Sequence, residues 1–227
     1  MQGNLEADMC GRMAITMPHD AMAQMFAATP ANDLPEVPEY NVCPTVQVHT
    51  VTSDDGTRHL RPMRWGFVPQ WYKKPNDGPL LINARAETIA DKPAFRTAAR
   101  ERRCLILATG FYEWTKTPEG ARLPWYIIRK DGTPLVFAGI WQTWDKGEDP
   151  LTTCAIVTTG ANAAVGSIHH RMPVVVEPAD WALWLGEAGK GAARLMTAAP
   201  EDMLEFYRVD PKVNSNRASG ADLIEPI

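Results

Sequence analysis

The chain has 227 residues, of which 45% are hydrophobic and 22% charged, so it can bury a core and is not a disordered tail. Its formal net charge of −4 excludes the strongly basic class of nucleic-acid-coating proteins, although a local basic groove is compatible with it. Four dispersed cysteines, with no CxxC pair and no Cys/His set at zinc-ligand spacing, favour neither a disulfide framework nor a structural zinc site. Apolar runs such as 134–141 are far shorter than the ~20 residues of a membrane helix, and we expect no secretory signal and a cytoplasmic protein.

The first part of the chain combines an extension, a helix and a loop. Residues 1–9 are polar and acidic, precede the first apolar pattern, and are expected to be an appendage. Apolar residues on one face of Asp20–Ala28 predict a helix. Three prolines in residues 29–39 predict a loop.

Strands dominate the rest of the chain. Several apolar runs are separated by turn-forming residues, and one of the runs alternates with period two. This pattern predicts three hairpins, which pair Val46–Thr52 with Leu60–Phe67, Cys104–Lys116 with Pro124–Arg129, and Trp125–Ile128 with Leu135–Trp141. Further strands are predicted at Thr153–Thr159 and Pro173–Val176, and helices at Pro93–Arg103, Ala179–Gly186 and Glu201–Tyr207. The mixture predicts an α+β fold in a single domain, with a curved, barrel-like antiparallel β core and a few short helices.

Cys10 is the first residue that can carry unusual chemistry. It becomes the N-terminal residue if translation starts at Met9 and Met9 is then removed. An N-terminal cysteine presents an α-amine of pKa about 7.7–8 beside a thiol of pKa about 8.5. The amine can form a Schiff base with an aldehyde, and the thiol can then close a thiazolidine ring. From these residues alone, a small buried cysteine near a fraying terminus is the favoured interpretation.

A second candidate is the alternating segment 81–88. Asn83, Arg85 and Glu87 recur with period two and can share one face of a strand. Asn supplies a donor and an acceptor, and Arg supplies a planar fork suited to phosphate. On the pattern alone, a solvated strand face with cross-strand pairs is the better explanation.

Two further places carry titratable side chains. Glu113 lies among the aromatics of residues 110–114, where desolvation would raise its pKa toward neutrality and suit it to general acid–base work. A carboxylate that points outward while its neighbours pack is an equal alternative. His169 and His170 are adjacent, so in a strand they would face opposite sides and at most one would enter a site. No acidic or cysteine ligand lies near them, and surface histidines are the commoner outcome.

Taken together, six ordered motifs resemble the SRAP family, the SOS response-associated peptidases or abasic-site processing proteins. They are Cys10–Arg12, Tyr40–Pro44, Arg64–Gly66, Ile82–Thr88, Gly110–Trp114 and Ile168–Pro173. The resemblance covers nearly the whole chain and implies a single SRAP domain over residues 10–227. It implies binding to single-stranded DNA that contains an abasic site. It further implies a covalent thiazolidine bond between Cys10 and the ring-opened sugar, with AP-lyase and self-processing peptidase activities.

The resemblance also assigns roles to individual residues. Cys10, Asn83, Glu113 and His169 match the catalytic residues of the family, and Arg12, Arg85, Trp71 and Trp114 match its DNA-contacting residues. The match at Trp71 is looser, because the loop that follows it differs in length among relatives. No cofactor or metal is implied, and we expect a monomer that is cytoplasmic and nucleoid-associated during repair.

The chain departs from the family in carrying nine residues before Cys10. A blocked amine cannot form a Schiff base, so we expect translation to start at Met9 or residues 1–9 to be cleaved, and we favour the first. Two other functions compete. An N-terminal-nucleophile amidohydrolase explains Cys10 but leaves Glu113 and His169 without roles. A non-catalytic single-strand-binding module would use only Arg12, Arg85 and the tryptophans.

Overall fold

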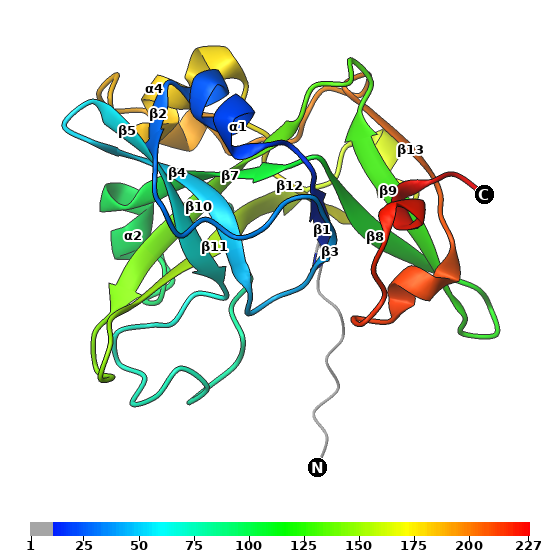
Figure 1. Cartoon of the computed structure of the whole chain (residues 1–227), viewed down its shortest axis with the longest axis horizontal. Helices are drawn as coiled ribbons and strands as arrows, with labels where there is room; N and C mark the ends of the chain where they lie inside the picture. Colours follow the sequence, from blue (N-terminus) through cyan, green and yellow to red (C-terminus); the bar gives the residue numbers. More distant parts are fainter. Residues whose placement is uncertain (1–10) are drawn as a thin grey trace.

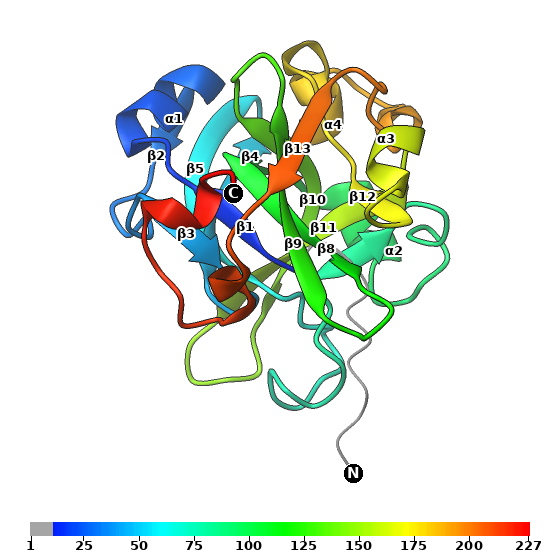
Figure 2. The same cartoon turned by 90° about the vertical axis from the view of Figure 1, so that its right-hand side faces the viewer.

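Two curved β-sheets packed against each other form the fold of residues 11–227, the part of the chain that the computed structural model describes (Figure 1). The predictions for residues 1–9 and for Cys10 therefore lie outside the described residues. Figure 2 shows the smaller sheet in front of the larger one. In the order β13-β9-β8-β1-β3, the smaller sheet comprises β13 (Leu204–Arg208), β9 (Arg122–Arg129), β8 (Gly110–Lys116), β1 (Met13–Ile15) and β3 (Glu39–Val42).

The larger sheet curls strongly. It comprises β12 (Arg171–Pro173), β11 (Leu151–Gly160), β10 (Leu135–Trp144), β7 (Arg103–Ala108), β4 (Gln47–Asp54), β5 (Thr57–Trp65) and β2 (Ala28–Pro30), with β6 (Asn83–Arg85) paired to β11. The curl brings β5 to β11 over two residue pairs, without closing a true barrel. The predicted α+β class and curved core are confirmed. The core is not purely antiparallel, because β2–β5, β5–β11 and β6–β11 pair in parallel.

Short helices pack against strands of the larger sheet. They are α1 (His19–Phe26), α2 (Arg96–Glu101), α3 (Ala163–Gly166) and α4 (Trp181–Leu185), with 3-10 turns η1 (Pro178–Asp180), η2 (Ala192–Leu195), η3 (Pro211–Asn214) and η4 (Ala221–Ile224). The rings of Phe26 and Trp181 join α1 to α4, with centroids 4.6 Å apart. Among the described residues, no helix combines the length and apolar character needed to cross a membrane.

The hydrophobic core lies between the two sheets. Phe111 of β8 and Phe137 of β10 are both fully buried, and their rings meet edge to face across the sheets at 5.8 Å. The buried indole N–H of Trp65 donates to the carbonyl of Ile82, and that of Trp184 donates to the carbonyl of Cys104. Each buried tryptophan thus keeps its polar group satisfied while it fills the core.

The first predicted hairpin forms as expected. β4 and β5 pair in antiparallel register up to Asp54 and Thr57. Asp55 and Gly56 between them have φ values of 50° and 82°, so both turn residues adopt the left-handed conformation that a two-residue hairpin turn requires. The Asp-Gly signal therefore specified this turn locally.

The second and third predicted hairpins need correction. The predicted strand Cys104–Lys116 is broken at Thr109, so β7 lies in the larger sheet and β8 in the smaller one; only β8 pairs with β9. The third hairpin is wrong, because β9 and β10 are joined by residues 130–134 but do not pair. The neighbours of β9 are β8 and β13, whereas those of β10 are β7 and β11.

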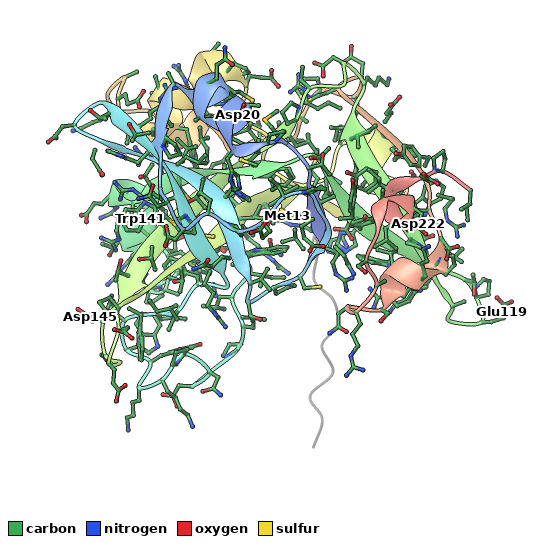
Figure 3. All side chains as sticks on the ribbon, in the orientation of Figure 1. Met13, Asp20, Glu119, Trp141, Asp145 and Asp222 are labelled. Atoms are coloured by element: carbon green, nitrogen blue, oxygen red, sulfur yellow. The ribbon has the colours of Figure 1, made fainter. Side chains whose placement is uncertain are left out.

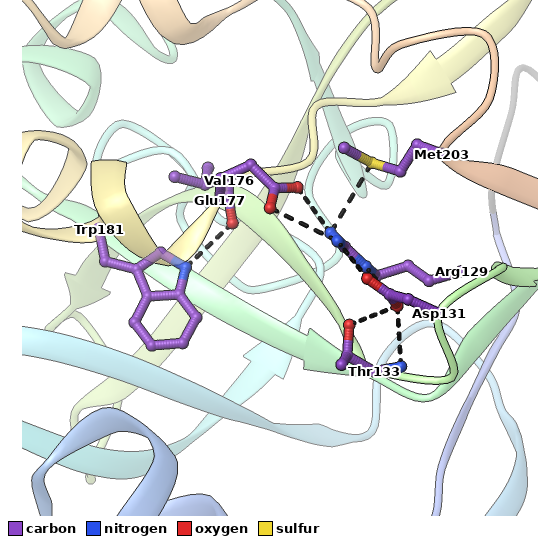
Figure 4. Close-up of polar contacts among 7 residues, drawn as sticks. All are labelled: Arg129, Asp131, Thr133, Val176, Glu177, Trp181 and Met203. Atoms are coloured by element: carbon purple, nitrogen blue, oxygen red, sulfur yellow. Dashed lines mark hydrogen bonds and ion pairs between the residues drawn. The ribbon is translucent and has the colours of Figure 1, made fainter.

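A charged cluster accompanies this crossing between the sheets (Figure 4). Arg129 at the end of β9 binds Asp131 at 2.8 Å and Glu177 at 2.6 Å. Asp131 also accepts hydrogen bonds from the main-chain N–H and the hydroxyl of Thr133. The turn is therefore fixed to the segment that follows β12 instead of folding β10 back onto β9.

Three other local predictions also differ from the structure. The predicted helix 201–207 is a turn followed by β13, whose Phe206 packs edge to face on Trp125 of β9. The predicted loop 29–39 includes residues of β2 and β3, short strands whose partners lie far along the chain. The strand predicted at Pro173–Val176 begins earlier, at Arg171, and continues beyond β12 only as a bridge from Val175 to Phe137.

Candidate functional site

The start of the described chain lies against β8. Met13 registers with Phe111 and Ala14 with Gly110, and the main-chain N–H of Tyr112 donates to the carbonyl of Arg12 at 3.0 Å. Gly110 permits the close packing here, because a Cβ atom would lie only 2.4 Å from the ring of Tyr126. The register leads the chain back toward Glu113 as it approaches residue 11, immediately after Cys10.

Arg12 is held rigidly beside Trp114. Its Nη1 donates to Asn41 Oδ1 at 2.5 Å and to the carbonyl of Val213 at 2.9 Å. Its guanidinium carbon lies 5.8 Å from the centre of the Trp114 ring. Two of the predicted DNA-contacting residues are thus brought together at one end of the antiparallel β1–β8 pair.

Glu113 is buried on β8, with only 4% of its surface exposed. It registers with Trp125 of β9 and sits in sequence between Tyr112 and Trp114. The outward-pointing alternative is therefore wrong, and the desolvated carboxylate is what the structure contains. Its catalytic role stays a prediction.

The segment that carries Asn83 and Arg85 forms β6. This strand pairs in parallel with Ile156–Thr158 of β11, which leaves Ala84 buried, Asn83 half-buried and Arg85 exposed. Thr158 registers with both Arg85 and Pro173, so β6 and β12 meet at the same stretch of β11.

An ion pair joins the segments that carry these two strands. Arg171 Nη1 and Nη2 bind the two carboxylate oxygens of Glu87 at 2.7 and 2.9 Å, and Nη2 also donates to the carbonyl of Thr158. The hydrogen bonds from Arg171 lower the pKa of Glu87 to about 2. Sequence reasoning did not identify Arg171 as a site residue, although it lies within the Ile168–Pro173 motif.

His169 follows α3 and lies in a turn. Its Nδ1 lies 3.2 Å from the main-chain nitrogen of Arg171 and 3.3 Å from the Arg171 carbonyl oxygen, so it accepts from the first in one tautomer and donates to the second in the other. The rings of His169 and His170 lie 4.4 Å apart with an interplanar angle of 34°. The pair does not belong to a strand, so the alternation that would place the two rings on opposite sides does not apply.

The four motifs surround one core. Met13, Phe111, Ala84 and Ile168 each lie within two residues of a predicted site residue, and all four are buried in the same hydrophobic cluster. Packing of these neighbours anchors the N-terminal strand, β8, β6 and the histidine turn around a common interior. That the site residues carried by these segments come together in one site stays a prediction.

Trp71 lies in the loop between β5 and β6. It is 55% exposed and packs edge to face on Tyr72, with ring centroids 6.3 Å apart. Tyr72 belongs to a separate small cluster with Val68 and Trp144, and the Trp144 indole donates to the Tyr72 carbonyl. The loop is therefore anchored, and the indole of Trp71 is free to meet a flat ligand.

A cavity of about 570 Å³ lies beside the edge strand β3. Its lining includes Asn41, Cys43 and His49, but none of the predicted site residues that the structure describes. Within residues 11–227, no group of three or more His, Cys, Asp or Glu side chains is arranged to hold a metal ion. The candidate site is therefore defined by the motifs and not by this cavity.

Comparison with known proteins points to one family. The profile of the SRAP family, described as SOS response associated peptidase, matches residues 9–216. The abasic site processing protein YoqW of Bacillus subtilis is 35% identical over 224 residues, covering 96% of this chain and 99% of YoqW. The abasic site processing protein YedK of Escherichia coli is 32% identical over 227 residues, covering 96% of this chain and all of YedK. A crystal structure of a Bacteroides thetaiotaomicron protein superposes with a TM-score of 0.84 at 23% identity, over 96% of this chain and all of that one.

Proposed function

This chain belongs to the SRAP family, and we propose that it captures abasic sites in single-stranded DNA through a covalent bond to Cys10. The observation that carries the proposal is the burial of Glu113 on β8, alongside the strand that begins just after Cys10. A buried carboxylate next to a reactive N-terminus is suited to moving protons during imine chemistry.

The proposed capture proceeds in two steps. The Cys10 amine attacks the C1′ aldehyde of the ring-opened sugar, and loss of one water gives an imine. The thiol sulfur then adds to the imine carbon and the nitrogen takes a proton, which closes the thiazolidine. Glu113 transfers protons to and from the amine and the sugar oxygen, His169 assists ring opening, and Asn83 orients the reacting groups.

The same imine allows a side reaction. Removal of a C2′ proton would eliminate the 3′ phosphate and cleave the strand, which is an AP-lyase reaction. Addition of the thiol consumes the imine and competes with this elimination. The balance between the two outcomes depends on how quickly the sulfur reaches the imine carbon.

The reaction requires a free amine at Cys10. We propose that translation starts at Met9 and Met9 is then removed, or that hydrolysis of the Met9–Cys10 bond in the longer chain exposes the amine. The start of the family match at residue 9 supports this location for the mature terminus. A monomeric state and a cytoplasmic location stay predictions.

The proposed function also includes contacts between the protein and the DNA strand. Arg12 and Arg85 would bind backbone phosphates, and Trp114 and the exposed Trp71 would stack on bases, as in other single-strand-binding sites. Such contacts are local and do not require a basic protein, so the net charge of −4 is no obstacle.

Intact-mass measurement tests the proposal. The full chain and a chain beginning at Met9 are each mixed with a single-stranded oligonucleotide carrying one abasic site. We expect a denaturation-stable gain of one oligonucleotide minus one water whenever Cys10 is the first residue. Cys10→Ser should abolish the gain, whereas the matched Cys43→Ser should retain it, because Cys43 lies in the β3 cavity where burial raises the pKa of its thiol. No gain from a chain with a free Cys10 amine would overturn the crosslinking function, and glutaminase activity would then support the amidohydrolase alternative.

A further inference from the structure

The free end of the β8–β9 ribbon carries two cations directly opposite each other. Lys116 of β8 registers with Arg122 of β9, and both residues are exposed. Trp114 lies two residues before Lys116 on the same strand and therefore shares its face. Like charges placed opposite each other destabilise a sheet, so folding alone gives no reason for this pair.

Trp114 is fixed against both arginines of this face. The guanidinium carbon of Arg122 lies 4.8 Å from the centre of the indole ring, and that of Arg12 lies 5.8 Å from it. The indole N–H donates to Asn214 Oδ1 at 2.6 Å, and the amide of Asn214 donates back to the carbonyl of Arg122. The ring is thus held in place by η3 as well as by its own strand.

No carboxylate neutralises the pair at the ribbon end. Throughout residues 11–227, neither Lys116 nor Arg122 forms an ion pair. The acids that contact η3, which packs on β9, are engaged with η3 itself: Asp222 pairs with Lys212, and Asp210 accepts the main-chain N–H of Lys212. Glu119 lies at the outer tip of the β8–β9 hairpin (Figure 3), where hydrogen bonds to its own main chain and to Thr117 lower its pKa.

We infer that Lys116 and Arg122 bind the phosphate backbone of the DNA strand that flanks the abasic nucleotide, beyond the Arg12 and Trp114 contacts. The strand then runs from Arg12 across Trp114 to the end of the β8–β9 ribbon. A guanidinium fork and an ammonium group suit phosphate, and an aromatic face between cations suits a single strand of any sequence. This inference rests on the proposed function and extends its DNA contacts along one flank.

Equilibrium binding separates this contact from the chemistry. The probe is a single-stranded oligonucleotide with a tetrahydrofuran abasic analogue, which has no aldehyde and cannot crosslink. Its flanks are lengthened on one side at a time, and the affinity is measured over a salt series. For the wild-type chain, we expect lengthening one of the two flanks to raise the affinity.

Arg122→Gln and Lys116→Gln should each lower the salt slope by about 0.7, the value for one phosphate contact to a single strand. They should also reduce the gain in affinity from that flank. Arg194→Gln is the matched control, because this substitution removes the same charge. Arg194 is exposed on η2, beside α4. Lys116→Gln leaves both arginines over Trp114 in place, so it tests the phosphate contact without disturbing the ring.

The possible failures are distinguishable. If both variants match Arg194→Gln in salt slope and flank dependence while the wild-type chain crosslinks an authentic abasic strand, the inference is overturned and the proposed function stands. If the wild-type chain shows flank-dependent binding that both variants lose but never crosslinks, the proposed chemistry fails and the contact is supported.

Discussion

Arg171 binds the carboxylate of Glu87, which lies 84 residues earlier in the chain. Its Nη1 and Nη2 donate to Glu87 Oε1 and Oε2 at 2.7 and 2.9 Å. The pair fixes the segment after β6 to β12, and with it the two motifs that carry Asn83 and His169. Arg171 is 11% exposed and Glu87 is 50% exposed, so one partner is sheltered while the other meets solvent. The geometry is bidentate, which adds orientation to the modest energy of such a pair.

A double-mutant cycle with Glu87→Gln and Arg171→Gln should give a coupling energy of about 0.5–1 kcal/mol in chemical unfolding, because the carboxylate is half exposed. The folded pKa of Glu87 is lowered from 4.5 to about 2. The stabilisation is therefore complete above pH 4.5 and is lost as the pH falls from 4.5 toward 2. Glu101→Gln, in the exposed pair with Arg102, serves as the control and should show little coupling. A coupling near zero at pH 7 would contradict this account.

Glu113→Gln removes the titrating carboxylate from β8 and keeps the shape of the side chain. We expect the rate of crosslinking at saturating DNA to fall by about 10²- to 10⁴-fold, the usual contribution of a positioned acid–base group. Affinity for the unreactive abasic analogue should change little, since Glu113 is only 4% exposed. Single-turnover kinetics over a pH series give the measurement. An unchanged rate would exclude Glu113 from proton transfer.

Trp71→Ala should weaken binding to a single strand by about 1–3 kcal/mol, the cost of losing one stacked base. The melting temperature should barely move, because the side chain is 55% exposed and contacts mainly Tyr72. Trp144→Ala gives the opposite pattern: Trp144 is 4% exposed, and its loss should cost about 3–5 kcal/mol of stability. Fluorescence anisotropy and thermal melts of both variants separate binding from folding. Unchanged DNA affinity in Trp71→Ala would remove this residue from the interface.

Arg129→Gln should destabilise the fold by about 0.5–1 kcal/mol, because the side chains of Asp131 and Glu177 are 52% and 39% exposed and water can replace the lost donor. The substitution leaves Asp131 and Glu177 without their common charged donor at the crossing between the sheets. Arg129 is 13% exposed, so its hydrogen bonds are partly shielded from water. Urea unfolding with Arg100→Gln, an exposed substitution on α2, provides the comparison. Equal midpoints for the two variants would show that the cluster contributes nothing to stability.

His49 makes the stability sensitive to mild acid. Burial, followed by the nearby His19, lowers the pKa of His49 from 6.5 to about 4, and the two Nε2 atoms lie 3.1 Å apart. The unfolded chain therefore binds the extra proton first, so stability is complete above pH 6.5 and falls as the pH drops from 6.5 to 4. The loss should reach about 2–4 kcal/mol.

The measurement is the free energy of unfolding at several pH values between 7 and 4. His49→Gln should flatten the profile in this window. His59→Gln should leave it intact, because the His59 side chain is 31% exposed at the surface. A wild-type profile that is flat between pH 6.5 and 4 would rule out a buried, neutral His49.

Local sequence patterns specified the features that depend on neighbours in the chain. Period-two alternation and the Asp55–Gly56 turn specified the β4–β5 hairpin, because the required left-handed backbone is a local property. The flanking aromatics made burial of Glu113 one of two expectations. The ordered motifs also identified the family, since their combination is far more specific than any one of them.

Tertiary structure alone decided which strands pair and which distant side chains meet. Alternation shows that a strand has a buried face, but it does not show which strands pair with its two edges. The separation of β9 from β10 and the strand at Leu204–Arg208 were therefore not predicted. The contact between Arg171 and Glu87 depends on how β6 and β12 align along β11, and the close approach of the His169 and His170 rings depends on the turn after α3. Such contacts follow from packing around a shared core, which no local pattern encodes.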